Sequence, residues 1–211
     1  GKNISSWTLS MDDFAVAVHE YGSRESGFSI RPVHAKLREI NNLALGVALY
    51  NKTLYEDALP YLRMEAEKGN SVAQFYIGVC YNLGRGVPKS PVTALGWYLK
   101  SAEQGVKEAQ YNVGYLYSRN GPSSLRDDKE ALAWFRKSAD QGYADAQRRL
   151  GEIYEYGWGP EQSYTDAAFW YRKAADQGHR EAQYLLASLY ASGKGVEASD
   201  KEAAYWFEKS A

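Results

Sequence analysis

From about residue 70 onward, the chain alternates apolar stripes of helical spacing with short breaks that contain glycine. Over residues 72–83 the apolar side chains recur every three or four positions, the period of one face of an α-helix. Gly84 then predicts the end of this helix, because glycine readily adopts the left-handed backbone of a C-terminal cap. Ser90 and Pro91 predict the N-cap and first position of a second helix, which runs to Gly105. The basic element is therefore a pair of helices.

This pair recurs with a nearly constant period, since the glycines that precede each pair are 36, 37 and 36 residues apart. The positions in phase are Gly69, Gly105, Gly142 and Gly178; Ala73, Ala109, Ala146 and Ala182, each followed by glutamine; Tyr81, Tyr117, Tyr154 and Tyr190; and Trp97, Trp134, Trp170 and Trp206. Asp127 and Ser199, each three residues before a glutamate, predict further capping boxes. A period of this length is typical of one supersecondary unit in a stacked array. We therefore predict a solenoid in which most of the recurring rings are packing residues.

Composition and charge restrict the classes of function. The chain has 25 basic and 26 acidic side chains among 211 residues, a balance that argues against electrostatic binding to nucleic acid or anionic membranes. Its apolar runs fall short of the roughly 20 residues that a membrane span needs. Cys80 is the single cysteine, which excludes an intrachain disulfide framework. The aromatic content of 14% argues against disorder.

Candidate chemistry is sparse. The three histidines, His19, His34 and His179, have no second histidine or cysteine at a metal-ligand spacing, so we expect neither a metal nor another cofactor. His179 falls at a turn between two pairs, where we expect a solvated side chain. Cys80 precedes the recurring Tyr81 within a helix, where a buried and inert thiol is expected. We find no catalytic constellation and do not expect an enzyme.

The segment from Ala109 to Gly142 resembles the Sel-one-like repeat family, a subclass of the tetratricopeptide-like solenoids. It carries A-Q-x-x-[LV]-G-x-x-Y, a loop with glycine, and then A-x-x-W-[FY]-x-K-[AS]-A-x-Q-G. The resemblance implies an all-α, right-handed α–α superhelix of about 10–11 helices and a bacterial source. We divide this one solenoid domain into an N-terminal cap segment (1–32), a tetratricopeptide-like helix pair (33–69), and four Sel-one-like repeats (70–105, 106–142, 143–178 and 179–211).

In this type of family the first helix of each pair lines the concave face, and its helical phase selects the side chains that point there. Several of them are aromatic although they are not the family's packing positions, and Tyr, Trp and Arg supply the hot spots of protein interfaces. The strip changes from apolar in the first repeat to acidic in the third, so a partner is expected to place an apolar segment near the first repeats and a basic one near the third. The predicted partner-binding residues, called the first-helix strip below, are Phe75, Val79, Asn82, Tyr111, Tyr115, Arg119, Arg148, Glu152, Glu155, Tyr156, Tyr184 and Ser188.

We therefore expect a non-catalytic interaction module that binds one protein partner on its concave face, and not nucleic acid. We expect a monomer unless its C-terminal end stacks on another molecule. Within this class, the resemblance leaves open a periplasmic immunity protein that neutralises a secreted toxin such as a phospholipase effector, and we favour the bacterial periplasm over the cytoplasm.

Two alternatives remain. The first is an adaptor or structural segment of a larger envelope or signalling assembly, since Ala211 ends the last repeat without its closing Gln-Gly. The second is a β-lactam-binding or β-lactam-hydrolysing enzyme. It is disfavoured because the relatives concerned pair two cysteines per repeat, whereas this chain has one cysteine in total.

Overall fold

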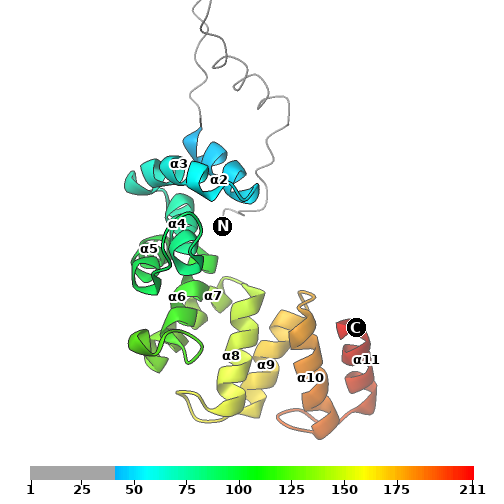
Figure 1. Ribbon diagram of the computed structural model, residues 1–211. Coiled ribbons are helices and arrows are strands. Elements are labelled where there is room, and N and C mark those ends of the chain that lie inside the picture. Colours follow the sequence, from blue (N-terminus) through cyan, green and yellow to red (C-terminus); the bar gives the residue numbers. More distant parts are fainter. Residues whose placement is uncertain (1–40) are drawn as a thin grey trace, which may run out of the picture.

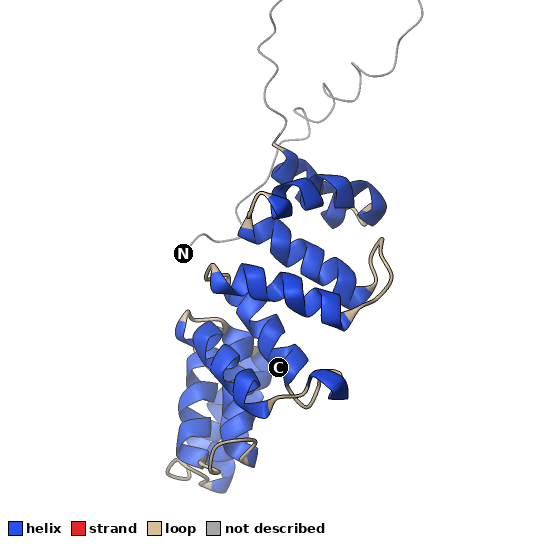
Figure 2. Cartoon of the chain, turned by 90° about the vertical axis from the view of Figure 1, so that its left-hand side faces the viewer, coloured by secondary structure: helices blue, strands red, loops and turns tan. Residues whose placement is uncertain are grey.

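The computed structural model describes residues 41–211, and over that range it contains ten α-helices, one 3₁₀ turn (η2, Ser123–Leu125) and no strand (Figure 2). The helices form consecutive pairs: α2 (Asn42–Asn51) with α3 (Tyr55–Glu67), α4 (Ser71–Leu83) with α5 (Pro91–Glu103), α6 (Lys107–Tyr117) with α7 (Asp128–Asp140), α8 (Ala144–Tyr156) with α9 (Tyr164–Ala175), and α10 (Arg180–Ser192) with α11 (Asp200–Ser210). The pairs follow one another along a curved path from α2 to α11 (Figure 1). The predicted all-helical solenoid is therefore confirmed, while the cap expected over residues 1–32 lies outside the described residues.

Helix starts and ends follow the local signals in the sequence. Ser90 caps α5 by accepting a hydrogen bond from the backbone N–H of Thr93 at 3.3 Å. Asp127 and Ser199 cap α7 and α11 in the same way, at 3.1 and 3.2 Å, which confirms both N-caps. The reciprocal half of the predicted capping boxes is wrong, because the backbone N–H groups of Asp127 and Ser199 donate to the carbonyls of Tyr117 and Tyr190. Gly84 ends α4 with φ of 72°, in the left-handed region that favours glycine.

A large ring on the second helix of a repeat fills the space that a glycine leaves on the first. The pairs are Gly78 with Tyr98, Gly114 with Phe135, and Gly151 with Tyr171. The three rings are at most 1% exposed, and a Cβ on any of these glycines would lie under 3.0 Å from a ring atom. These rings were not predicted from the sequence, because a more conspicuous tryptophan directly precedes each of them. The fourth repeat has Ala187 in place of the glycine, and its Phe207 remains 37% exposed.

The recurring tryptophans pack between repeats, as predicted. Trp134, Trp170 and Trp206 are buried. Arg136 covers the ring of Trp170 with its Cζ 4.9 Å from the ring centroid, and Arg172 covers Trp206 at 5.1 Å. Each arginine comes from the second helix of the preceding repeat, so these cation–π contacts join one repeat to the next.

The recurring alanine–glutamine pair is explained by a ladder of hydrogen bonds. The first-helix glutamines Gln74, Gln110, Gln147 and Gln183 donate from Nε2 to the carbonyl of the alanine eight residues earlier, each at 3.1 Å. The Oε1 atoms of Gln74, Gln110 and Gln147 accept from Nε2 of Gln104, Gln141 and Gln177 at 2.7–2.8 Å. Buried amides need such partners. Within residues 41–211, Oε1 of Gln183 is buried without one.

Candidate partner-binding surface

The aromatic part of the first-helix strip lies partly in the core. Phe75 and Val79 pack against the buried cluster around Tyr98, while Tyr111 and Tyr115 pack against the cluster around Phe135. The ring centroids of Phe75 and Tyr98 are 6.0 Å apart, and those of Tyr111 and Phe135 are 5.6 Å apart. All four side chains are half-buried, so the expectation that they avoid packing positions needs correction.

The charged part of the strip is largely neutralised within the protein. Arg148 is 7% exposed and forms ion pairs with Glu152 at 2.5 Å and with Glu181 of α10 at 3.2 Å. Arg149 forms a second ion pair with Glu152 at 2.6 Å. The expectation that Arg148 offers its charge to a partner is therefore corrected, because α10 of the following repeat covers it.

Three further strip residues make polar contacts within their own helix pair. Glu155 accepts a hydrogen bond from the phenol of Tyr171 at 2.7 Å, and burial raises the pKa of that phenol. The Ser188 hydroxyl donates to the carbonyl of Tyr184 at 3.0 Å. Asn82 is half-buried near the phenol of Tyr98.

Three strip residues keep a large exposed surface. Tyr156 and Tyr184 are each 55% exposed, and the side chain of Arg119 is 46% exposed. Tyr184 meets Phe207 edge to face, with ring centroids 5.5 Å apart. These side chains are the part of the strip that a partner can reach.

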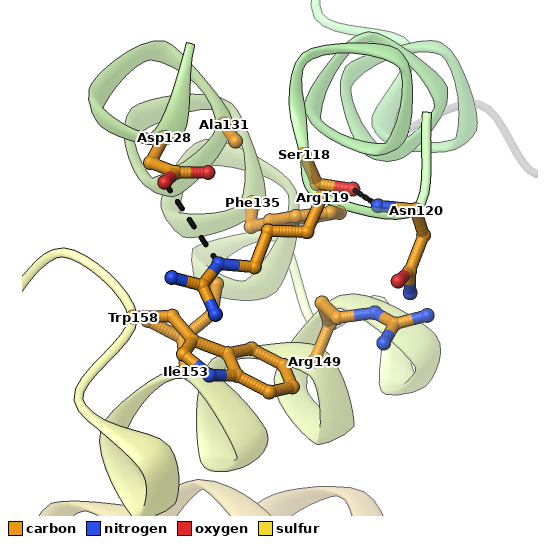
Figure 3. Close-up of a pocket in the computed structure, with 9 residues that line it drawn as sticks. All are labelled: Ser118, Arg119, Asn120, Asp128, Ala131, Phe135, Arg149, Ile153 and Trp158. Carbon is orange, nitrogen blue, oxygen red and sulfur yellow. Dashed lines mark hydrogen bonds and ion pairs between the residues drawn. The ribbon is translucent and has the colours of Figure 1, made fainter. Parts of the chain in front are cut away.

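Two of these residues, Tyr156 and Arg119, contact Trp158, a residue that was not predicted from the sequence. The rings of Tyr156 and Trp158 are stacked, with centroids 4.9 Å apart and an interplanar angle of 21°. The guanidinium of Arg119, from the loop after α6, lies across the Trp158 ring at 5.3 Å (Figure 3). Trp158 was not predicted because it lies in the loop after α8, where the helical periodicity used to select the strip does not apply. The available signal was its flanking glycines, Gly157 and Gly159.

A small pocket lies beside this stack, between the second and third repeats (Figure 3). Its lining is Ser118, Arg119, Asn120, Asp128, Ala131, Phe135, Arg149, Ile153 and Trp158. Asp128 accepts a hydrogen bond from Arg126 at 2.8 Å, which holds the pKa of this carboxyl below its ordinary range. Of the two guanidinium groups at this pocket, Arg149 is therefore paired with Glu152, whereas Arg119 lies 3.9 Å from a carboxylate that Arg126 already engages.

Outside this surface, the two side chains singled out earlier have structural roles. Cys80 is fully buried, as predicted, and burial raises the pKa of its thiol to about 11. The expectation for His179 is wrong, because its side chain is only 17% exposed. Its Nδ1 accepts from the backbone N–H of Ala182, and its Nε2 lies 3.2 Å from Oδ1 of Asp145 in the preceding repeat.

Neither a metal cluster nor a membrane span is found in the described part of the chain. Residues 41–211 contain no group of three or more His, Cys, Asp or Glu side chains arranged to hold a metal ion. None of the helices described is long and apolar enough to cross a membrane.

The fold and surface define an α-solenoid of stacked helix pairs. The Sel1 repeat model matches residues 71–106, 107–143, 144–179 and 180–211, so the chain belongs to the Sel1 repeat family. These matches begin at α4, so α2 and α3 precede them.

Solved structures of two bacterial proteins support this assignment. The protective antigen c5321 of uropathogenic Escherichia coli is 35% identical with a TM-score of 0.75, covering 80% of this chain and 37% of that one. A Sel1 repeat protein from Oxalobacter formigenes is 34% identical with a TM-score of 0.73, covering 80% of this chain and 69% of that one.

Among curated proteins, the chain is similar to DAP3-binding cell death enhancer 1 of Rattus norvegicus. The two are 36% identical over 86 residues, which cover 38% of this chain and 17% of the relative. The chain therefore spans only a small part of that relative's length. Sel1 repeat proteins are protein-interaction modules, which agrees with the class expected from the sequence.

Proposed function

We propose that this chain is a non-catalytic binding module whose protein partner docks on the first-helix strip around Tyr156 and Tyr184. One observation carries the proposal: these two tyrosines remain 55% exposed in a fold that buries or half-buries most of its rings. Tyrosine combines a large apolar ring with a hydroxyl and is enriched at interface hot spots. The name of the rat relative, which states that it binds a protein, supports the same class of function.

The expected contribution of the two tyrosines can be stated as a change in affinity. A hot-spot truncation costs at least about 2 kcal/mol of binding free energy. That is roughly a 30-fold increase in Kd. The cost to folding should be small, because more than half of each side chain is already in water.

The test begins with affinity capture of a stoichiometric partner from the source lysate, followed by measurement of its Kd by calorimetry. We expect the double variant Tyr156→Ser/Tyr184→Ser to weaken binding by roughly 30-fold or more while its melting temperature stays close to that of the unmodified protein. Tyr205→Ser is the matched control, because Tyr205 is 47% exposed but lies on α11, a second helix. Equal binding by the double variant and the control would refute the proposal.

A periplasmic immunity protein that neutralises a secreted toxin is the finer form of this proposal. Its support is the family resemblance together with a surface suited to one protein partner. Co-expression with the toxin encoded beside its gene should protect cells. Unchanged toxin sensitivity after deletion of the gene would exclude this role.

A further inference from the structure

We infer that the pocket between the second and third repeats binds a carboxylate side chain of an acidic segment in the protein partner. This inference rests on the proposed function and specifies the chemistry that the partner presents. The pocket is lined by Arg119 and Arg149 from neighbouring repeats, with Trp158 beside them (Figure 3).

Arg119 is oriented for such a ligand but lacks an acceptor for its terminal nitrogens. Its guanidinium lies over Trp158 at 5.3 Å, and its nearest recorded ionic contact is from Nε to Asp128 at 3.9 Å. Asp128 is already engaged by Arg126, which donates to both of its oxygens at 3.3 and 2.8 Å. The contact with Trp158 holds the guanidinium beside the pocket, and its terminal nitrogens are left to bind a carboxylate in a bidentate pair.

Arg149 places a second guanidinium on the far side of the pocket. Its side chain is 13% exposed, and Nη1 donates to Glu152 at 2.6 Å. In the amide orientation that satisfies both groups, the oxygen of Asn120 accepts from Nη1 and Nη2 of Arg149 at 3.0 and 3.2 Å. The Nε of Arg149 is buried. Arg149 is therefore engaged within the protein, and Arg119 is the guanidinium with which a carboxylate can pair.

The deep side of the pocket is closed. Phe135 and Ile153 line it, and both are buried in the core of these repeats. An acidic side chain would therefore stay at the mouth of the pocket, where its carboxylate reaches Arg119. Asp128 at the rim adds a repulsive charge, which disfavours a dianionic phosphoryl group more strongly than a singly charged carboxylate.

This combination does not recur between the other repeats, so it is not a requirement of repeat packing. The equivalent positions are Leu83 and Gly121 between the first and second repeats, and Tyr156 and Lys194 between the third and fourth. Arg85 also lies over aromatic rings, but its guanidinium donates to the hydroxyl of Tyr50. Unlike Arg85, Arg119 therefore lies over an aromatic ring with no acceptor for its terminal nitrogens.

The experiment selects peptides from a random phage-displayed library on the whole chain and measures the affinity of individual peptides by fluorescence polarisation. We expect the selected peptides to share an Asp or Glu, and Arg119→Gln to weaken their binding about tenfold or more. Replacing the shared acidic residue by its amide should cause a similar loss, and the two changes together should cost little more than either alone. Added salt should weaken binding to the unmodified chain more than to the variant.

Lys194→Gln is the matched control, because Lys194 lies over Tyr164 at 5.2 Å in the equivalent loop of the fourth repeat. It should leave affinity within about twofold of the unmodified chain. The inference is overturned if no peptide is enriched, if the selected peptides lack acidic residues, or if Arg119→Gln and Lys194→Gln behave alike. Binding of the captured partner to the same variants distinguishes failure of this inference from failure of the proposed function. If the Tyr156→Ser/Tyr184→Ser variant loses partner binding but Arg119→Gln does not, the proposed binding module is supported and the carboxylate site is refuted.

Discussion

The contact between a first-helix glycine and a second-helix ring leads to a prediction about stability. Replacing glycine by alanine should have opposite effects at two positions. Gly114 of α6 faces the fully buried ring of Phe135, and a Cβ at residue 114 would lie 2.8 Å from the nearest ring atom. Gly96 of α5 is exposed, and a Cβ there would meet nothing within 4 Å. Alanine should therefore destabilise the protein at the first position and stabilise it at the second.

The two positions share one energetic contribution and differ in another. Replacing glycine by alanine inside a helix gains about 1 kcal/mol, because less backbone entropy is lost on folding. Forcing an extra methyl group into a packed core costs about 1–3 kcal/mol. Because the helix contribution is common to both variants, their difference isolates the packing cost. We therefore expect Gly114→Ala to be about 1–3 kcal/mol less stable than Gly96→Ala.

The free energy of unfolding is measured by urea denaturation followed by circular dichroism. A rescue variant makes the assay specific: in Gly114→Ala/Phe135→Leu the smaller side chain leaves room for the methyl group. The double variant should therefore be more stable than the sum of the single changes predicts. Equal stability of Gly114→Ala and Gly96→Ala, or strict additivity in the double variant, would refute the packing argument.

Two further predictions concern titratable groups. The thiol of Cys80, with its pKa raised to about 11 by burial, should not react with a disulfide reagent at about pH 8 until the protein is unfolded in denaturant, and rapid reaction in the native state would contradict its burial. The hydrogen bond with His179 holds the pKa of Asp145 below its ordinary value of 3.8, so its contribution to stability is present above that pH and is lost as pH falls through the lower folded pKa. Thermal melts of Asp145→Asn should accordingly show a weaker loss of stability below about pH 4 than the unmodified protein, and parallel pH profiles would exclude this contribution.

Local chemistry made much of the fold predictable from the sequence. The helix ends at Gly84 and the cap at Ser90 depend on backbone geometry within a few residues, and both are found where expected. The period of the repeat added the stacking order, because identical units bury identical faces. The interior was less predictable: a tryptophan is a conspicuous marker, whereas Phe135 is recognised as the filling ring only when Gly114 is seen opposite it.

The candidate surface was harder to predict because helical phase places a side chain on a face without showing what covers that face. Tyr111, Arg148 and Tyr184 occupy the same register of their helices. Tyr111 meets Tyr143 of the next repeat with ring centroids 5.4 Å apart, and Arg148 meets Glu181 of the next repeat at 3.2 Å. Tyr184 meets only Phe207 of its own helix pair among the described rings, with centroids 5.5 Å apart, and stays 55% exposed. Equal phase therefore gave unequal exposure, and the difference comes from contacts between repeats.

The contact between Arg119 and Trp158 differs from the corresponding cation–π contacts between the other repeats. In the first repeat a loop cation, Arg85, covers a tyrosine ring of the preceding helix pair at 5.2 Å, and Lys194 covers Tyr164 in the same manner. The third repeat reverses the partners, since its loop carries the ring of Trp158 and the preceding repeat supplies Arg119. The cation–π contact between repeats is preserved. The reversal places the guanidinium of Arg119 at the edge of a pocket whose carboxylate, Asp128, is already paired with Arg126, and this leaves a positive group held over Trp158 with no acceptor for its terminal nitrogens.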